Sequence, residues 1–405
     1  PPGAGQPRPS PPAAPLPHPT PRGVPRFLST PPRLARLAWG SDGPPEILTA
    51  AFDRAVGDFA LAPDGRAFFT ADDEGLVKVF AVTAGGAVAE HGSLEAGTYT
   101  ALRTGGTTLA AVWESAVSPP EVVRIDADGS RHPLTAFNAA RAAQIDWRPV
   151  EHFWFTSSRG KRIHSLVVLP PGFDPSKKYP LFVLIHGGPH LMLGDSFVAR
   201  WNFHLLARPG YVLIAPNYSG STGFGERFAQ SIQGDPLAGP ARELNEAADA
   251  AIRRYPFIDA SRQFAGGASY GGHLANWLAV STTRYRALVS HAGLYDLRSQ
   301  WATSDVAYSR EKNLGGPPWE GRAVWREQSP FYRSRQLRTP ILVTFGERDF
   351  RVPLNNALEF WTVLKRQDVP SRLVIFPEEN HWILRGENSR EFYRDVHDWV
   401  ARHGG

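Results

Sequence analysis

The feature that most constrains the fold is an alternation of apolar strands and helices from about residue 149 onward. The stretches Leu181–Ile185 and Ile341–Phe345 are almost continuously apolar, as strands buried on both faces are. Helices are expected over residues 244–254, after Gly271, after Pro353 and from about Ser389. The helix after Pro353 places four apolar residues on one stripe: Leu354, Leu358, Trp361 and Leu364. Residues 149–405 are therefore predicted to form an α/β domain with a doubly wound sheet.

Residues 27–148 have a different texture, with short alternating strands separated by turn signals such as Pro63-Asp64-Gly65 and Asp72-Asp73-Glu74-Gly75. Strands recurring at this spacing predict a β-propeller-like region. Two or three such cycles cannot close a ring, which takes at least about four blades. Residues 27–148 are therefore predicted to form a partial propeller.

Residues 1–26 are rich in proline, which removes backbone donors and prevents a packed element. We expect a disordered or polyproline-like arm. A docking ligand for an aromatic-lined groove is the alternative interpretation.

Composition excludes several classes of function. The chain has no cysteine, which rules out disulfides and cysteine nucleophiles. Its net charge of +5 is carried by scattered residues, and nucleic-acid binding is not expected because it needs a clustered basic patch. No apolar stretch approaches the roughly 20 residues that span a bilayer. No signal peptide is visible after Pro1, and no His, Glu and Asp grouping has metal-ligand spacing.

A single serine stands among four glycines in the stretch GGASYGG, residues 266–272. The pattern Gly267-x-Ser269-x-Gly271 follows an apolar strand and precedes an apolar helix. A nucleophile elbow requires this arrangement, because glycines remove the Cβ atoms that would clash in a tight strand-to-helix crossing. The alternative is a glycine-rich turn with a buried serine.

Three further polar signals follow predicted strands. The stretch His186-Gly187-Gly188-Pro189 predicts an oxyanion hole formed by the amides of Gly188 and Tyr270, with an ordinary turn as the alternative. Asp349 occupies the position of a triad acid; Glu347 is the competing carboxylate, and a helix cap is the alternative role. His381 completes the order Ser, Asp, His, so it is the predicted general base.

These motifs together resemble the prolyl oligopeptidase family of serine peptidases over residues 27–405. The stretches that carry the resemblance are HGGPH, PNYSGSTGFGERF, GDP, GGASYGG, LGGPPWE, GERDFRVP and FPEENHWI, and they are similar to the acylaminoacyl-peptidase and dipeptidyl-peptidase V branch. The resemblance implies an α/β-hydrolase fold behind a propeller of about seven blades, of which this chain would keep the last few. It implies a chain truncated at its N-terminus, with Ser269, Asp349 and His381 as a triad that needs no cofactor.

The resemblance also implies a substrate pocket near Tyr270, Leu294, Trp301 and Val352 that holds Ala or a larger hydrophobic side chain. Leu294 and Trp301 are equally compatible with a place in the core. Many relatives have Arg where Ser219 stands, which implies that a supporting ion pair is absent here.

The expected function is a serine exopeptidase that acts on short peptides through an acyl-enzyme, as a dipeptidyl- or acylaminoacyl-peptidase. The alternatives are a carboxylesterase, because the same triad cleaves esters, and an inactive or binding form. The resemblance favours a periplasmic or secreted protein over a cytoplasmic one. The oligomeric state is left open, a homo-oligomer included.

Overall fold

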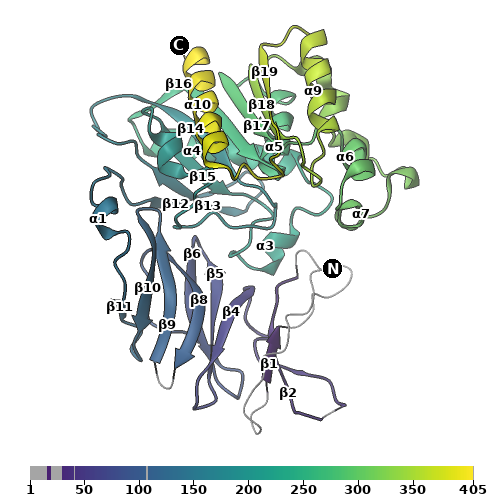
Figure 1. Ribbon diagram of the computed structural model, residues 1–405. Helices are drawn as coiled ribbons and strands as arrows, with labels where there is room; N and C mark the ends of the chain where they lie inside the picture. Colours follow the sequence, from purple (N-terminus) through teal and green to yellow (C-terminus); the bar gives the residue numbers. More distant parts are fainter. Residues whose placement is uncertain (1–15, 20–29, 41, 106–107, 405) are drawn as a thin grey trace. The chain divides into compact units, whose positions relative to one another are not determined.

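The computed structural model describes residues 16–19, 30–40, 42–105 and 108–404 (Figure 1). They form two compact units. The β-rich unit contains the described residues up to Ile145 together with Gly194–Phe197 and Thr222–Gln230. The α/β unit contains Asp146–Leu193, Val198–Ser221 and the described residues from Ser231 onward. Within the described ranges, no helix has both the length and the apolar character needed to cross a membrane.

The main sheet of the β-rich unit consists of two successive antiparallel meanders. One short parallel pairing, Val77 with Thr98, joins them. Glycine with positive φ closes the predicted turns, as at Gly65 (φ +85°), whose amide donates to the Ala62 carbonyl. The strands are β4 (Val56–Leu61), β5 (Ala67–Asp73), β6 (Leu76–Val82), β7 (Val88–Glu90), β8 (Thr98–Gly105), β9 (Thr108–Ser115), β10 (Ser118–Ile125) and β11 (Arg131–Pro133). This is the propeller-like region expected from the sequence.

A second, three-stranded sheet precedes it, formed by β1 (Leu16–Pro19), β2 (Leu34–Leu37) and β3 (Glu46–Ile47). Strand β1 lies within the proline-rich stretch 1–26 and pairs antiparallel with β2. The predicted disorder is therefore wrong for these four residues, because an edge strand tolerates proline. The prediction for the remainder of 1–26 lies outside the described residues.

Two segments that follow residue 148 in the sequence belong to the β-rich unit. Asp195, which is 5% exposed, accepts hydrogen bonds from the amides of Gly97 (2.8 Å) and Ala116 (2.7 Å). Thr222 donates to Asp72 at 2.8 Å. The unit also includes the short helices α1 (Ala139–Ala142) and α3 (Glu226–Gln230). The predicted regions are continuous stretches of sequence, whereas this unit is assembled from three.

The α/β unit is built on an eight-stranded sheet in the order β12-β13-β15-β14-β16-β17-β18-β19. The first two strands are antiparallel to their neighbours, and the remaining pairs are parallel. The strands are β12 (Glu151–Thr156), β13 (Arg162–Val168), β14 (Tyr179–Ile185), β15 (Val212–Asn217), β16 (Ile258–Ala268), β17 (Ala287–His291), β18 (Ile341–Gly346) and β19 (Ser371–Phe376). The expected doubly wound α/β fold is confirmed.

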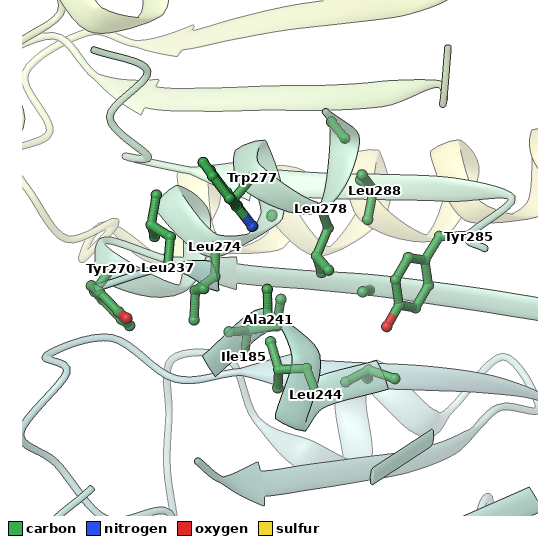
Figure 2. Packing of buried hydrophobic residues seen from close by; sticks show 14 of the residues in the cluster. Ile185, Leu237, Ala241, Leu244, Tyr270, Leu274, Trp277, Leu278, Tyr285 and Leu288 are labelled. Carbon is green, nitrogen blue, oxygen red and sulfur yellow. The ribbon is translucent and has the colours of Figure 1, made fainter. Parts of the chain in front are cut away.

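Helices cover both faces of this sheet. Alternate residues of β14 divide between the faces, since Leu181, Val183 and Ile185 join the main hydrophobic cluster with helices α4, α5 and α9. Figure 2 shows α5 side chains, including Leu274 and Leu278, packed beside Leu244 of α4. The helices are α2 (Phe203–Ala207), α4 (Ala238–Arg254), α5 (Tyr270–Ala279), α6 (Leu297–Thr303), α7 (Ala307–Leu314), α8 (Val324–Glu327), α9 (Asn355–Arg366), α10 (Gly386–His403), and the 3-10 turns η1 (Pro318–Glu320) and η2 (Pro330–Gln336).

Candidate active site

Ser269 occupies the turn between β16 and α5. Its backbone has φ +58° and ψ −120°, a strained conformation for a residue with a side chain. The Ser269 amide donates to the His291 carbonyl at 2.9 Å, and its carbonyl accepts from the His273 amide at 2.9 Å. Its hydroxyl makes no capping hydrogen bond to α5. The turn therefore holds the backbone and leaves the hydroxyl available.

The glycines around Ser269 are required by close backbone contacts. A Cβ atom on Gly267 or on Gly271 would lie 2.1 Å from the carbonyl oxygen of Ile185 in β14. A Cβ on Gly272 would lie 2.5 Å from the His291 carbonyl in β17. Because all these obstacles are main-chain atoms of central strands, any other residue at these positions would force the backbone to shift.

Asp349 follows β18 and is 2% exposed. Its Oδ1 accepts from the amides of Arg351 and Val352, both at 2.9 Å. Its Oδ2 lies 2.7 Å from Nδ1 of His381. Asp349 caps no helix, because α9 begins only at Asn355, and the competing Glu347 is exposed. Asp349 is thus the carboxylate that orients His381.

The loop that carries His381 is anchored by Glu379. This carboxylate is 3% exposed and accepts from the amides of Leu384 and Arg385, both at 3.0 Å, and from Asn388 Nδ2 at 2.7 Å. Burial alone would raise the pKa of Glu379, but these hydrogen bonds lower it overall. The loop also packs tightly on β18, since a Cβ on Gly346 would lie 2.0 Å from the Asn380 carbonyl.

The strand register brings Ser269, Asp349 and His381 to one edge of the sheet. Ala268 pairs with His291, and His291 pairs with Thr344, so the carboxyl ends of β16, β17 and β18 are adjacent. Asp349 and His381 are hydrogen bonded, whereas no hydrogen bond joins the Ser269 hydroxyl to His381 within the described chain. Such contacts commonly tighten only when substrate is bound. The arrangement can support transfer of the serine proton to a histidine held by a carboxylate.

His291 is a residue that sequence reasoning missed. Its carbonyl holds the Ser269 amide, and its Nδ1 lies 2.9 Å from the Thr344 hydroxyl. Burial, with the neighbouring His381 as a second cause, lowers the pKa of His291 to about 4, so its ring is neutral. The only sequence signal was its position at a strand end. Glu379 was missed as well, although it stands two residues before His381.

The two predicted oxyanion amides have no competing partner among the described residues. Gly188 has φ +115°, and Tyr270 is the first residue of α5, where the amide has no intrahelical acceptor. Neither amide donates to another residue in the part of the chain that the structure describes. Both are therefore available to a ligand oxygen.

Three histidines near these motifs, His186, His190 and His273, were predicted from the sequence to be structural or to support the site, and the structure gives two of them structural contacts. His186 stacks on Tyr218, with ring centroids 4.2 Å apart, and its Nε2 lies 2.9 Å from the Ser221 hydroxyl. Burial lowers the pKa of the His186 ring to about 4. His190 Nδ1 lies 2.9 Å from the Gly220 carbonyl. His273 is fully buried.

The expectation that an ion pair is absent near Ser219 is wrong, because other cations supply it. Glu243 is fully buried, and its carboxylate accepts from the Ser219 amide and hydroxyl, both at 2.7 Å. Arg159 Nη1 and Lys161 Nζ lie 3.5 Å and 3.9 Å from Glu243 Oε1. Basic residues of the turn between β12 and β13 therefore neutralise this carboxylate.

The predicted pocket residues are partly core. Leu294 and Val352 are 2% and 4% exposed and belong to the main hydrophobic cluster. Trp301 is half-buried, and its Nε1 donates to Glu311 at 2.9 Å. Within the described residues, no group of three or more His, Asp or Glu side chains could hold a metal ion.

Comparison with known proteins gives concordant matches. The model of the prolyl oligopeptidase family matches residues 196–405. Dipeptidyl-peptidase 5 of Schizosaccharomyces pombe is 32% identical over 291 residues, which cover 71% of this chain and 42% of that protein. Dipeptidyl-peptidase 5 of Porphyromonas gingivalis is 34% identical over 290 residues, covering 70% and 42%.

Among solved structures, an acylaminoacyl peptidase of Pyrococcus horikoshii is similar in fold. Its TM-score is 0.84 at 24% identity, over 94% of this chain and 60% of that one. The chain spans about half the length of the curated relatives it matches.

Proposed function

This chain belongs to the prolyl oligopeptidase family, and from that membership and the site geometry we propose that it is a serine exopeptidase that hydrolyses short peptides through an acyl-enzyme. The bond cleaved would release a dipeptide or an acylated amino acid. The apolar side chains of Leu294 and Val352 favour a substrate with Ala or a larger hydrophobic side chain at the residue next to that bond.

In the first half of the reaction the Ser269 hydroxyl attacks the scissile carbonyl and gives its proton to Nε2 of His381. The developing oxyanion accepts hydrogen bonds from the amides of Gly188 and Tyr270. When the tetrahedral intermediate collapses, the C–N bond breaks and His381 returns the proton to the leaving amine. The acyl group is then an ester on Ser269.

In the second half His381 takes a proton from water, which attacks the ester. The Ser269 oxygen leaves with that proton, and the acid product is released. Asp349 stays ionised throughout and holds Nδ1–H of His381, which keeps Nε2 as the acceptor. These steps use only side chains and amides of the α/β unit.

The observation that carries the proposal is the 2.7 Å contact between Asp349 and His381 beside the strained turn at Ser269. If Asp349 only capped a helix or formed an ion pair on the surface, its carboxylate would not need to be buried with Oδ1 held by two backbone amides. The same elbow in an inactive protein would retain strain without use.

The test is hydrolysis of chromogenic amides of Gly-Phe, Lys-Ala, Gly-Pro and acetyl-Ala beside a nitrophenyl ester, by the chain and by Ser269→Ala. We expect Ser269-dependent amide cleavage, and the preferred amide distinguishes dipeptidyl from acylaminoacyl activity. Ester cleavage alone would indicate an esterase. If no substrate is cleaved and a fluorophosphonate does not label Ser269, the proposal fails.

A further inference from the structure

Arg310 of α7 is a cation without a carboxylate partner among the described residues. Its Nε donates to Oε1 of Gln300 at 3.1 Å, which is the one hydrogen bond of its side chain to the described residues. No ion pair to Arg310 is present in the described part of the chain. The adjacent Glu311 accepts instead from Trp301 Nε1. The two Nη groups of Arg310 therefore have no acceptor within the described part of the chain, although a guanidinium carries five N–H donors.

Arg310 is partly enclosed by protein. Burial lowers its pKa to about 10, so it remains protonated at neutral pH. The side chain nevertheless keeps accessible surface and is half-buried. Because enclosed charges are normally paired, a missing partner at such a place points to a ligand.

Gln300 locates this guanidinium relative to the candidate active site. It is 1% exposed, and its Nε2 donates to the Arg351 carbonyl at 2.9 Å and to the Ser304 hydroxyl at 3.2 Å. Arg351 stands two residues after Asp349. Gln300 is thereby fixed to the loop that carries the candidate acid, and it presents its amide oxygen to Arg310.

The charge of Arg310 also acts on two residues of α5. Burial raises the pKa of Tyr270 and lowers that of His273, and the positive charge of Arg310 lowers the pKa of both. Tyr270 directly follows Ser269 in sequence.

The nearby Arg351 provides a contrast. Its guanidinium is paired with Asp305, with Nε 2.6 Å from Oδ1. One arginine beside the site is thus neutralised by a carboxylate of the chain and the other is not. An anion that pairs with Arg310 would come from outside the described residues.

We propose that Arg310 is a specificity-determining residue that binds the carboxylate of a glutamate side chain at the substrate residue whose carbonyl Ser269 attacks. The methylene groups of that side chain would lie against the apolar Leu294, Trp301 and Val352. Guanidinium and carboxylate form strong, charge-assisted hydrogen bonds. This inference rests on the proposed function. It changes the expected substrate side chain from a purely apolar one to one with apolar methylene groups and a terminal carboxylate.

The test compares matched Gly-Glu and Gly-Gln amides, and acetyl-Glu and acetyl-Gln amides, which differ only in the charge of the tip. Four proteins are assayed: the original chain, Arg310→Met, Arg310→Lys and Lys312→Met, the last a change of another cation on the same helix. We expect kcat/KM for the Glu substrates to exceed that for Gln, and Arg310→Met to lower it about 10- to 100-fold, the range for a hydrogen bond to a charged group. Arg310→Lys should retain part of the preference, and Lys312→Met all of it.

A binding measurement separates this inference from the proposed function. Calorimetry on Ser269→Ala with Gly-Glu-Ala-Ala and Gly-Gln-Ala-Ala reports on the pocket without turnover, and circular dichroism verifies that each variant is folded. Preferential binding of the Glu peptide that Arg310→Met abolishes supports the inference even if the chain hydrolyses nothing. Equal binding and equal turnover of the Glu and Gln compounds, or a Glu preference that survives Arg310→Met, would overturn it while leaving the peptidase intact.

Discussion

Replacing Gly271 by Ala tests whether the turn at Ser269 depends on direct contact between backbones. Gly271 and Gly386 are both in the first turn of a helix, α5 and α10 respectively. Helix propensity alone predicts that alanine stabilises both positions, by up to about 1 kcal/mol. The structure instead predicts that Gly271→Ala lowers the free energy of unfolding, whereas Gly386→Ala does not. A Cβ on Gly271 would lie 2.1 Å from the Ile185 oxygen and 2.9 Å from the His186 oxygen, whereas a Cβ on Gly386 has nothing within 4 Å.

Overpacking of a core typically costs about 1–3 kcal/mol, and here the obstacles are backbone atoms of a central strand, which cannot rotate away. We therefore expect Gly271→Ala to unfold roughly 2–10 °C lower and to lose fluorophosphonate labelling of Ser269. Gly386→Ala should be at least as stable as the original chain. Thermal unfolding and urea titration measure both. If Gly271→Ala proved as stable as Gly386→Ala and were still labelled, the reasoning from close contact would be refuted.

Two further changes address the acid and its loop. Asp349→Asn should lower kcat about 10³- to 10⁴-fold with little change in unfolding temperature, because it favours the wrong tautomer of His381; a fall of less than tenfold would argue against the assigned role. Glu379→Gln should destabilise the chain at pH 7. The folded-state pKa of Glu379 is below its ordinary value of 4.5, so its contribution is present above pH 4.5 and is lost as pH falls through the folded pKa. Urea unfolding at several pH values should show the gap between Glu379→Gln and the original chain narrowing on acidification, and a constant gap would contradict this.

The sheet and the positions of the site residues were accessible from the sequence because each depends on local pattern. Continuous apolar runs indicated strands buried on both faces, and parallel strands place their carboxyl ends at one edge. Ser269, Asp349 and His381 each follow such a strand in the sequence, and the structure places them there. The choice of Asp349 over Glu347 needed the structure, since only the loop geometry shows which carboxylate meets His381.

Features that depend on contacts between distant residues could not be predicted. The apolar stripe expected on α9 included Leu358, which is 48% exposed, whereas Phe360 is 1% exposed. Several apolar residues in that helix allow more than one stripe, and the packing partner decides which is buried. The pairing of Glu243 with Arg159 and Lys161 likewise joins residues about 80 positions apart, and no local pattern marks such a pair.

The two segments that the later sequence contributes to the β-rich unit affect the order in which this chain can mature. The amides of Gly97 and Ala116 find their acceptor only in Asp195, and Asp72 finds Thr222 only further on. A nascent chain that has emerged from the ribosome only as far as residue 148 therefore holds every described strand of this unit with these groups unsatisfied. The β-rich unit can reach its final form only after residue 230 has been synthesised, so it cannot be completed before the first strands of the α/β unit have also been made.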